Sequence, residues 1–232
     1  MKTFARISWL FATISIFTSL ALMIVLFYLT PKPYSRKIVA WAIRLSLFFT
    51  IDLEGEEDPE AQMFLLNHQS DLDIGITETI TSRDLAWVAK KELFDIPFFG
   101  LALKLPEAIS VTRESKTSLL KLLKDAKDRL EKGKVITMFP EGTRSTKGKM
   151  LPFKSGAKML ADKYKLKVQP IVLMQTAKYY NVKDFYYKPG RIKVIYMDSF
   201  VADRKNPDWL NNLRVEMQKV YDDELANNPS HR

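Results

Sequence analysis

The residue best suited to acid–base chemistry in this chain is His68, which is followed five positions later by Asp73. The chain has two histidines and no cysteine, and the second histidine, His231, is the penultimate residue. Because histidine is the side chain that titrates near neutral pH without perturbation, His68 is the natural general base. The composition also excludes covalent catalysis by cysteine, and it leaves too few histidine and cysteine side chains for a zinc site.

A spacing of five residues puts His68 and Asp73 on different faces of one helix, so the two side chains meet only if they lie in different elements. Leu65-Leu66 ends an apolar run typical of a strand, and the residues from Ile74 onward favour a helix. We therefore predict that His68 lies in the strand-to-helix loop and that Asp73 lies in the first helical turn. The carboxylate would then fix the imidazole tautomer and leave the other ring nitrogen free to take a proton.

The same segment allows other interpretations. Ser70 and Asp73 match a capping box, in which the acidic residue only closes the first turn of a helix. Ser70 is also a conceivable hydrolase nucleophile, although the chain has no Gly-x-Ser-x-Gly elbow. Asp71 and Asp73 resemble the Asp-x-Asp pair with which a glycosyltransferase holds a divalent cation beside a diphosphate.

A second segment, Phe139 to Ser145, has the composition of an anion-binding turn, with the sequence Phe-Pro-Glu-Gly-Thr-Arg-Ser. Gly142 permits a backbone conformation that other residues avoid, and Arg144 offers a planar fork of donors suited to phosphate or carboxylate. The hydroxyl groups of Thr143 and Ser145 add further donors. The glycine spacing excludes a nucleotide-binding P-loop, so an ordinary polar turn is the remaining alternative.

Strand-like and helical segments alternate around these two motifs. One helix is predicted between Val111 and Val135, where leucines follow helical spacing and Gly133 ends the run, and another from about Asp208 to Leu225. This alternation predicts a layered α/β domain. Strands are predicted at residues 63–66, 85–89, 135–139, 168–173 and 192–196.

The N-terminal part of the chain differs in composition from the rest. From Ile7 to Thr30 there is no charged side chain, and as a helix this run would reach about 36 Å, enough to cross a hydrocarbon core of about 30 Å. The apolar region of a secretory signal is usually shorter, about 7–15 residues, so we predict an uncleaved membrane anchor with a helix at about 7–30.

A second apolar run, at residues 38–51, follows the helix-ending segment Pro31-Lys32-Pro33 and is interrupted by Arg44. It is too short to span a bilayer, and we predict an interfacial helix, with a buried helix of the globular domain as the alternative. The predicted organisation is therefore a membrane anchor over residues 1–51 and one globular domain over residues 52–232.

The chain carries a net charge of +9, from 36 Lys and Arg against 27 Asp and Glu. Such a balance attracts nucleic acid, anionic lipid or an acidic protein. Beside a membrane anchor, anionic lipid is the favoured partner, and no signature of a nucleic-acid-binding module is present. Basic residues flank the first apolar run on both sides, so they do not fix its orientation in the membrane.

Together, the motifs resemble those of the glycerolipid acyltransferase family, whose signature is His-x-x-x-x-Asp followed by Phe-Pro-Glu-Gly-Thr-Arg-Ser. The resemblance covers about residues 60 to 175. It is strongest with the 1-acylglycerol-3-phosphate (lysophosphatidic acid) acyltransferases, which often have Asn-His-Gln-Ser before the aspartate. Segments 89–93, 97–100 and 151–156 are also similar to family blocks. The resemblance implies a mixed sheet flanked by helices, preceded by membrane-embedded helices.

The resemblance also implies a base-catalysed acyl transfer without an acyl-enzyme, a metal or a bound cofactor. His68 would take the proton from the sn-2 hydroxyl of lysophosphatidic acid while Asp73 orients the ring. The alkoxide would then attack the thioester of acyl-CoA or acyl-carrier protein and give phosphatidic acid. The reaction is expected at the cytoplasmic face of a membrane, the inner membrane if the protein is bacterial. The family residues that bind the glycerol phosphate correspond to Glu141, Gly142, Thr143 and Arg144.

One further family block, roughly Gly-x-Ile-Phe-Ile-Asp-Arg, aligns with the segment Glu107 to Arg113. Here Glu107 replaces the glycine and Thr112 replaces the aspartate, whereas Arg113 matches. The resemblance makes Arg113 a candidate phosphate ligand, and Lys90 is a further one.

Other functions stay open at this point. Within the same chemistry, the acceptor could be another lysophospholipid or glycerol 3-phosphate itself. A different class is a metal-dependent membrane glycosyltransferase using Asp71 and Asp73, which a chelator would inactivate. A third class is a basic membrane-binding protein without catalytic activity, in which replacing His68 would change nothing.

Overall fold

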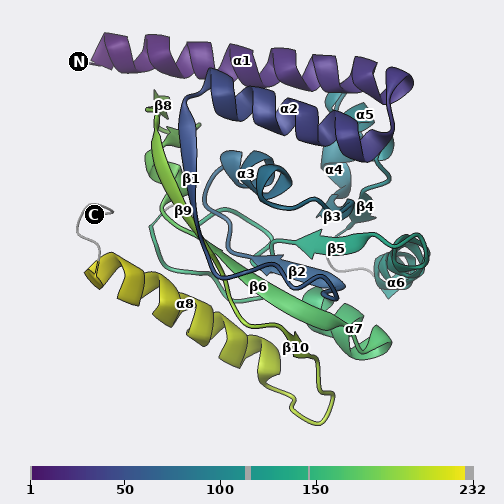
Figure 1. Ribbon diagram of the computed structural model, residues 1–232. Coiled ribbons are helices and arrows are strands. Elements are labelled where there is room, and N and C mark those ends of the chain that lie inside the picture. Colours follow the sequence, from purple (N-terminus) through teal and green to yellow (C-terminus); the bar gives the residue numbers. More distant parts are fainter. Residues whose placement is uncertain (1, 113–115, 146, 228–232) are drawn as a thin grey trace.

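The computed structural model describes residues 2–112, 116–145 and 147–227. Two apolar helices lie side by side along one face of the molecule, α1 (Lys2–Leu29) and α2 (Lys32–Ser46) (Figure 1). The hydroxyl groups of Ser15 and Ser46 join them at 2.7 Å. The segment Arg6–Leu29 is the one helical segment, within the described ranges, that is long and apolar enough to cross a membrane.

The predicted bounds of the second helix, 38–51, are wrong at both ends. The helix begins six residues earlier because Pro33 occupies its first turn, where a missing backbone N–H costs nothing. It ends at Ser46 because the next residues form β1 (Phe49–Glu54), which pairs in parallel with β9 (Gly190–Tyr196). The sheet therefore begins at Phe49, inside the predicted anchor.

A mixed sheet forms the centre of the molecule, as predicted (Figure 1). Its strand order is β1-β9-β6-β2-β5-β3-β4, with β10 paired to β6. β9 and β10 run antiparallel to β6, whereas the other pairs are parallel. The remaining strands of this sheet are β2 (Met63–Leu66), β3 (Leu85–Lys90), β4 (Ile109–Val111), β5 (Val135–Met138), β6 (Lys167–Leu173) and β10 (Phe200–Val201).

Helices cover both faces of the sheet. The helix α3 (Leu72–Ile80) packs between α2 and one face, whereas α6 (Lys116–Glu131), α7 (Ser155–Tyr164) and α8 (Trp209–Asn227) cover the other face (Figure 1). The shorter elements are α4 (Lys91–Phe94), α5 (Phe99–Lys104), a 3₁₀ turn η1 (Thr176–Lys178), and a separate hairpin of β7 (Tyr180–Asn181) and β8 (Tyr186–Tyr187).

The central strand β2, which leads into the loop of His68, is held rigidly because both of its faces are buried. Successive side chains of a strand point to opposite faces, so Met63 and Leu65 enter the core beneath α6 to α8 while Phe64 and Leu66 enter the core beneath α3. All four are fully buried. A strand that is buried on both faces has a continuous run of apolar residues, and this pattern predicted β2 from the sequence.

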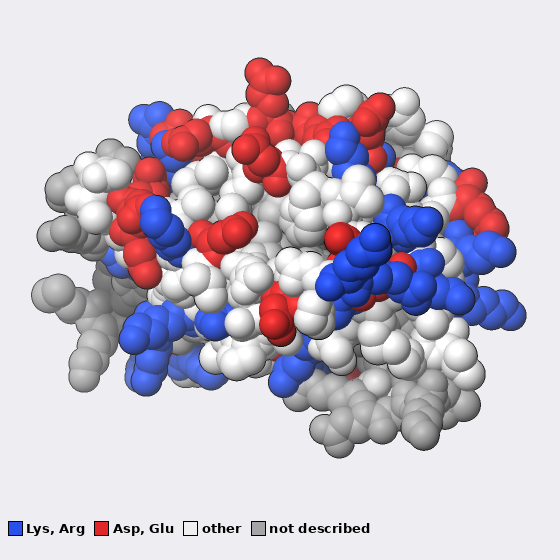
Figure 2. Space-filling model, turned by 90° about the horizontal axis from the view of Figure 1, so that it is seen from below, with Lys and Arg blue, Asp and Glu red and all other residues white. Residues whose placement is uncertain are grey.

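The two outer surfaces of the molecule differ in chemistry. Figure 2 shows basic and acidic side chains interspersed on the face opposite α1 and α2. Many form pairs one helical turn apart, such as Lys121 with Asp125 and Lys219 with Asp223. By contrast, α1 and α2 expose large apolar side chains, among them Phe11, Ile14, Phe17, Tyr34, Trp41 and Leu45.

Candidate active site

His68 and Asp73 meet as the sequence predicted. β2 ends at Leu66 and α3 begins at Leu72, so His68 lies in the loop and Asp73 in the first turn. His68 Nδ1 lies 2.7 Å from Asp73 Oδ2. With Nδ1–H donating to the carboxylate, Nε2 carries the free lone pair that a general base requires.

Asp73 also closes the start of the helix. Its Oδ2 accepts the backbone N–H groups of Gln69 at 2.7 Å and Ser70 at 2.9 Å, and its Oδ1 accepts the Thr176 hydroxyl at 2.5 Å. The residue is fully buried. The same carboxylate therefore closes the loop and orients the imidazole, but the capping box is only half formed, because the N-cap of α3 is Asp71, whose side chain makes no capping hydrogen bond.

The alternative nucleophile, Ser70, is not available for chemistry. It is buried, and its hydroxyl donates to the Tyr180 carbonyl oxygen at 2.7 Å. This bond ties the loop of His68 to the β7–β8 hairpin.

Aromatic side chains support the imidazole from behind. The ring of Phe139 is stacked on His68 with a centroid distance of 3.9 Å and an interplanar angle of 9°. Trp87 lies 5.3 Å from Phe139, and its indole N–H donates to Glu78 Oε1 at 2.8 Å. The His68 side chain keeps 16% of its surface exposed, so one side of the ring is held and the other is accessible.

The carboxylate of Glu141 accepts hydrogen bonds from the backbone of two loops. Its Oε1 accepts the backbone N–H of His68 at 2.8 Å and its Oε2 accepts that of Leu151 at 2.7 Å. It is 1% exposed, and burial raises the pKa of its carboxyl against the opposing effect of these two hydrogen bonds. The carboxylate of Glu141 is buried and fastens the 139–151 loop to the loop of His68, and its role in binding the substrate stays a prediction.

The rest of this segment forms the accessible part of the site. Gly142 has a φ of +67°, which explains the need for glycine in this turn. Thr143 and Arg144 are exposed and line a hollow of about 110 Å³ beside the His68 loop. Arg144 forms an ion pair with Asp71 across this hollow.

That ion pair decides against the Asp-x-Asp metal site. Asp71 is exposed and faces Arg144, whereas Asp73 is buried with both oxygens engaged by protein donors. Two carboxylates that face different partners do not form a shared cation site. Within the described residues, no group of three or more His, Asp and Glu side chains is placed to hold a metal ion.

The other predicted ligands are less closely connected to His68. Lys90 ends β3 and is half-buried at the same sheet edge, but it does not line the hollow. Arg113 lies outside the described residues. Glu107 has a φ of +64°, which explains why the family block has glycine there.

Sequence reasoning missed four residues that hold the loop in place. The Asn67 side chain exchanges hydrogen bonds with the backbone of Leu173, at 2.9 Å and 2.7 Å. The Gln69 side chain donates to the Tyr221 hydroxyl of α8 at 3.0 Å. Thr176 could have been found, because it follows β6 and the carboxyl ends of parallel strands meet at one edge. Tyr221 lies far from Gln69 in the sequence, and no pattern in the sequence indicates that the two side chains meet.

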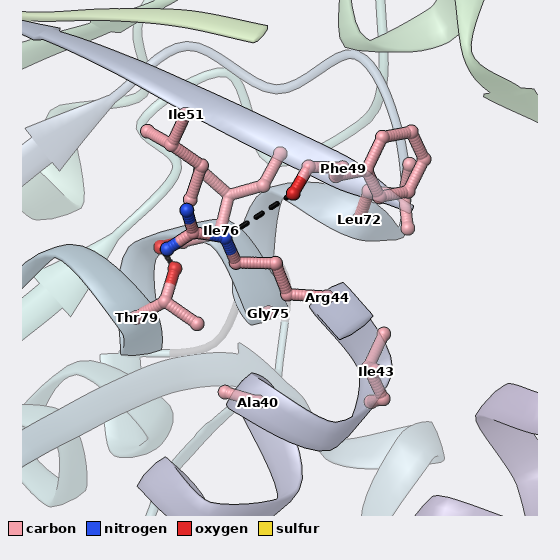
Figure 3. Close-up of a pocket in the computed structure, with 9 residues that line it drawn as sticks. All are labelled: Ala40, Ile43, Arg44, Phe49, Ile51, Leu72, Gly75, Ile76 and Thr79. Carbon is pink, nitrogen blue, oxygen red and sulfur yellow. Dashed lines mark hydrogen bonds between the residues drawn. The ribbon is translucent and has the colours of Figure 1, made fainter. Parts of the chain in front are cut away.

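A small apolar pocket lies between α2, β1 and α3 (Figure 3). Its volume is about 10 Å³, the space of a single water molecule, so it is a packing gap and not a ligand site. Arg44 lies at its edge, where its Nε donates to the Phe49 carbonyl oxygen at 3.2 Å (Figure 3).

Comparison with known proteins places this chain among acyltransferases. The sequence model of a family described as Acyltransferase matches residues 37–174. A 1-acyl-sn-glycerol-3-phosphate acyltransferase of Helicobacter pylori (strain J99 / ATCC 700824) is 41% identical over 182 residues, which are 76% of this chain and 77% of that protein. The chloroplastic 1-acyl-sn-glycerol-3-phosphate acyltransferase LPAT1 of Arabidopsis thaliana is 35% identical over 162 residues, 66% of this chain and 45% of that one.

A solved structure has the same fold. The 1-acyl-sn-glycerophosphate (LPA) acyltransferase PlsC of Thermotoga maritima superposes with a TM-score of 0.73, covering 98% of this chain and 97% of that chain. The sequence identity is 21%, so this similarity concerns the fold and not the details of the site.

Proposed function

The chain belongs to the acyltransferase family, and from this premise we propose that it is a 1-acyl-sn-glycerol-3-phosphate acyltransferase. It transfers a fatty acyl group from a thioester to the sn-2 hydroxyl of lysophosphatidic acid, and the product is phosphatidic acid. The observation that carries the catalytic part of this proposal is the His68 Nδ1–Asp73 Oδ2 contact of 2.7 Å, beside a hollow that Arg144 lines.

In the proposed mechanism, His68 Nε2 removes the proton from the acceptor hydroxyl as its oxygen attacks the thioester carbonyl carbon. Asp73 stabilises the imidazolium that forms. The tetrahedral intermediate then expels the thiolate, which takes the proton from His68, so the base is regenerated. The stacked Phe139 ring limits rotation of the imidazole, and rotation would otherwise reduce the time spent in attack geometry. No metal or bound cofactor is needed for these steps.

Arg144 and Thr143 are the proposed ligands of the acceptor's phosphate. Both line the hollow, and a guanidinium group can bind phosphate oxygens through two parallel hydrogen bonds. The pair that Arg144 forms with Asp71 is exposed and therefore weak enough for a phosphate to replace. Lys90 and Arg113 stay candidates for the same role.

We propose that α1 and α2 attach the protein to the cytoplasmic face of a membrane. They expose apolar side chains on the same side of the molecule, and the opposite face is charged (Figure 2). α1 runs along the domain beside α2 and contacts β8 (Figure 1), an arrangement that suits a helix embedded along the bilayer surface. A lipid acceptor would then reach the His68 loop without leaving the membrane.

A product assay tests this proposal. Detergent-purified protein is offered lysophosphatidate, glycerol 3-phosphate or lysophosphatidylcholine, with acyl-CoA or acyl-carrier protein as donor, with and without chelator. We expect phosphatidate from lysophosphatidate, unaffected by chelator. The variant His68→Ala should lose about 10²–10⁴-fold in kcat, the usual contribution of a general base.

The chain offers a matched control in its other histidine. His231→Ala should retain full activity. A loss smaller than about tenfold for His68→Ala would contradict the mechanism, and an unchanged rate would favour a non-catalytic role for this histidine. Acylation of another acceptor alone would retain the mechanism and change the substrate.

A further inference from the structure

We propose that Lys183, in the β7–β8 hairpin, is a second cationic ligand of the acceptor's phosphate, because it lines the same hollow as Arg144. This inference rests on the proposed function and adds a residue that determines acceptor specificity. Neither the two sequence motifs nor the family blocks include the hairpin, so sequence reasoning did not point to this lysine.

Three segments that are far apart in the sequence form the hollow. The His68 loop contributes residues 69–71, the loop between β5 and α7 contributes Thr143 and Arg144, and the hairpin contributes residues 180–183. A ligand in this space therefore lies next to the loop that carries the base. Lys183 and Arg144 are the two cationic side chains among the residues that line it.

The hairpin is fixed relative to the base. The Ser70 hydroxyl donates to the Tyr180 carbonyl oxygen at 2.7 Å, and the Tyr180 hydroxyl lies 3.1 Å from Thr13 Oγ1 of α1. β8 lies next to α1, and the rings of Trp9 and Phe185 meet edge to face at 4.8 Å (Figure 1). The hairpin thus stands between the apolar helix and the His68 loop, where a headgroup would enter from the membrane.

The turn of the hairpin holds the backbone of Lys183 in place. Asn181 Oδ1 accepts the backbone N–H of Lys183 at 3.0 Å and that of Asp184 at 3.3 Å, and Asn181 Nδ2 donates to Asp184 Oδ2 at 2.7 Å. Asparagine stabilises tight turns through bonds of this kind. One oxygen of the neighbouring Asp184 carboxylate thus accepts from Asn181, and Lys183 is exposed among the residues that line the hollow.

Charge makes Lys183 suitable for a phosphomonoester. Arg144 is already paired with Asp71, so these two side chains together carry no net charge. Lys183 adds a positive charge that, in the part of the chain that the structure describes, has no carboxylate within ion-pair distance. Two lysines on helical surfaces, Lys158 and Lys219, differ in this respect, since each is paired with an aspartate. A phosphomonoester carries a charge of about −1.5 to −2 and matches two cations better than one.

The experiment compares Lys183→Gln, Lys183→Arg and a control, Lys188→Gln. Lys188 directly follows β8. Its Nζ lies 5.5 Å from the centroid of the Tyr179 ring, and it does not line the hollow. For each protein, kcat and KM are measured with lysophosphatidate in mixed micelles, and KM is measured separately for the acyl donor. We expect Lys183→Gln to raise the KM for lysophosphatidate about tenfold, since one charge-assisted contact is lost.

Lys183→Gln should leave kcat and the donor KM within about twofold of the wild type. Lys183→Arg, which retains the positive charge, should keep the acceptor KM of the wild type. The control Lys188→Gln should also resemble the wild type. An unchanged acceptor KM in Lys183→Gln overturns the proposal. So does a rise in donor KM alone, which would assign Lys183 to a phosphate of the donor, or an equal rise in Lys188→Gln, which would indicate general surface attraction. A wild type that makes no phosphatidate would instead refute the proposed function itself.

Discussion

The Thr176 hydroxyl donates a 2.5 Å hydrogen bond to Asp73 Oδ1, and so joins the end of β6 to the helix that orients His68. With Oδ2 receiving His68 and two backbone N–H groups, both oxygens of this buried carboxylate are occupied. The base is thus positioned by contacts from the segments that follow β2 and β6, and not by the helix alone.

Asp73→Asn is expected to reduce kcat by about 10²–10⁴-fold. An amide has one accepting atom, so its NH₂ group must face either the Thr176 hydroxyl or the donors at Oδ2, and the imidazole loses its tautomer and its orientation. Steady-state kinetics with lysophosphatidate check this, with circular dichroism to confirm folding. A folded variant with more than a tenth of wild-type kcat would contradict this role.

Phe139→Leu should lower kcat about three- to tenfold and leave the KM for lysophosphatidate within twofold. The substitution retains most of the apolar volume but removes the ring that is stacked on His68, a contact worth about 0.5–1.5 kcal/mol. Phe139→Tyr, which retains the ring, is the matched control. Equal losses in the two variants would point to packing of the loop instead of support of the imidazole.

Arg36→Ala should destabilise the protein strongly. Arg36 Nη1 lies 3.4 Å from Glu78 Oε1, and both side chains are 6% exposed, so removing the cation leaves a buried carboxylate without its charge partner. Such a loss costs about 3–5 kcal/mol and would lower Tm by roughly 6–20 °C in a chain of this size. Arg36→Met combined with Glu78→Gln, which removes both charges, should recover much of the loss in a thermal melt. A double variant as unstable as Arg36→Ala would refute the charge argument.

The contribution of Asp58 to the stability of the folded protein is expected to be lost in acid. Its hydrogen bond with Lys167, followed by those with the Ser199 hydroxyl and the Glu60 backbone N–H, lowers the pKa of its carboxyl from 3.8 to about 2. Since the folded pKa lies below the unfolded one, this stabilisation is fully present above pH 3.8 and is lost as the pH falls through about 2. The difference in Tm between the wild type and Asp58→Asn should therefore shrink over this range. A constant difference from pH 6 to pH 2 would contradict the prediction.

The sequence predicted the features that depend on neighbouring residues. The loop position of His68, the helical position of Asp73 and the central strands follow from apolar patterns within a few residues. The predicted start of α2 was wrong because proline, which usually ends a helix, is also tolerated in a first turn, where Pro33 lies. The predicted end of α2 was wrong because the residues after it form β1, which depends on pairing with β9, a strand far along the chain.

Side-chain roles were harder to predict than elements. Glu141 belongs to the motif, but whether a motif carboxylate faces the substrate or the protein depends on which backbone N–H groups approach it. The hairpin of β7 and β8 has two residues in each strand, too few for a periodic pattern. The contribution of Lys183 to the hollow therefore becomes visible only in three dimensions.

The hydrogen bond from Gln69 to Tyr221 implies an order of events during synthesis. The ribosome releases α1 and α2 first, and they pack through contacts such as that between Ser15 and Ser46, which need nothing made later. The loop of His68 is braced only when Tyr221 of α8, made some 150 residues after Gln69, has been translated and docked. A nascent chain therefore exposes its apolar helices before the loop of His68 is braced, and with the function proposed above, attachment to lipid would come before acyl transfer.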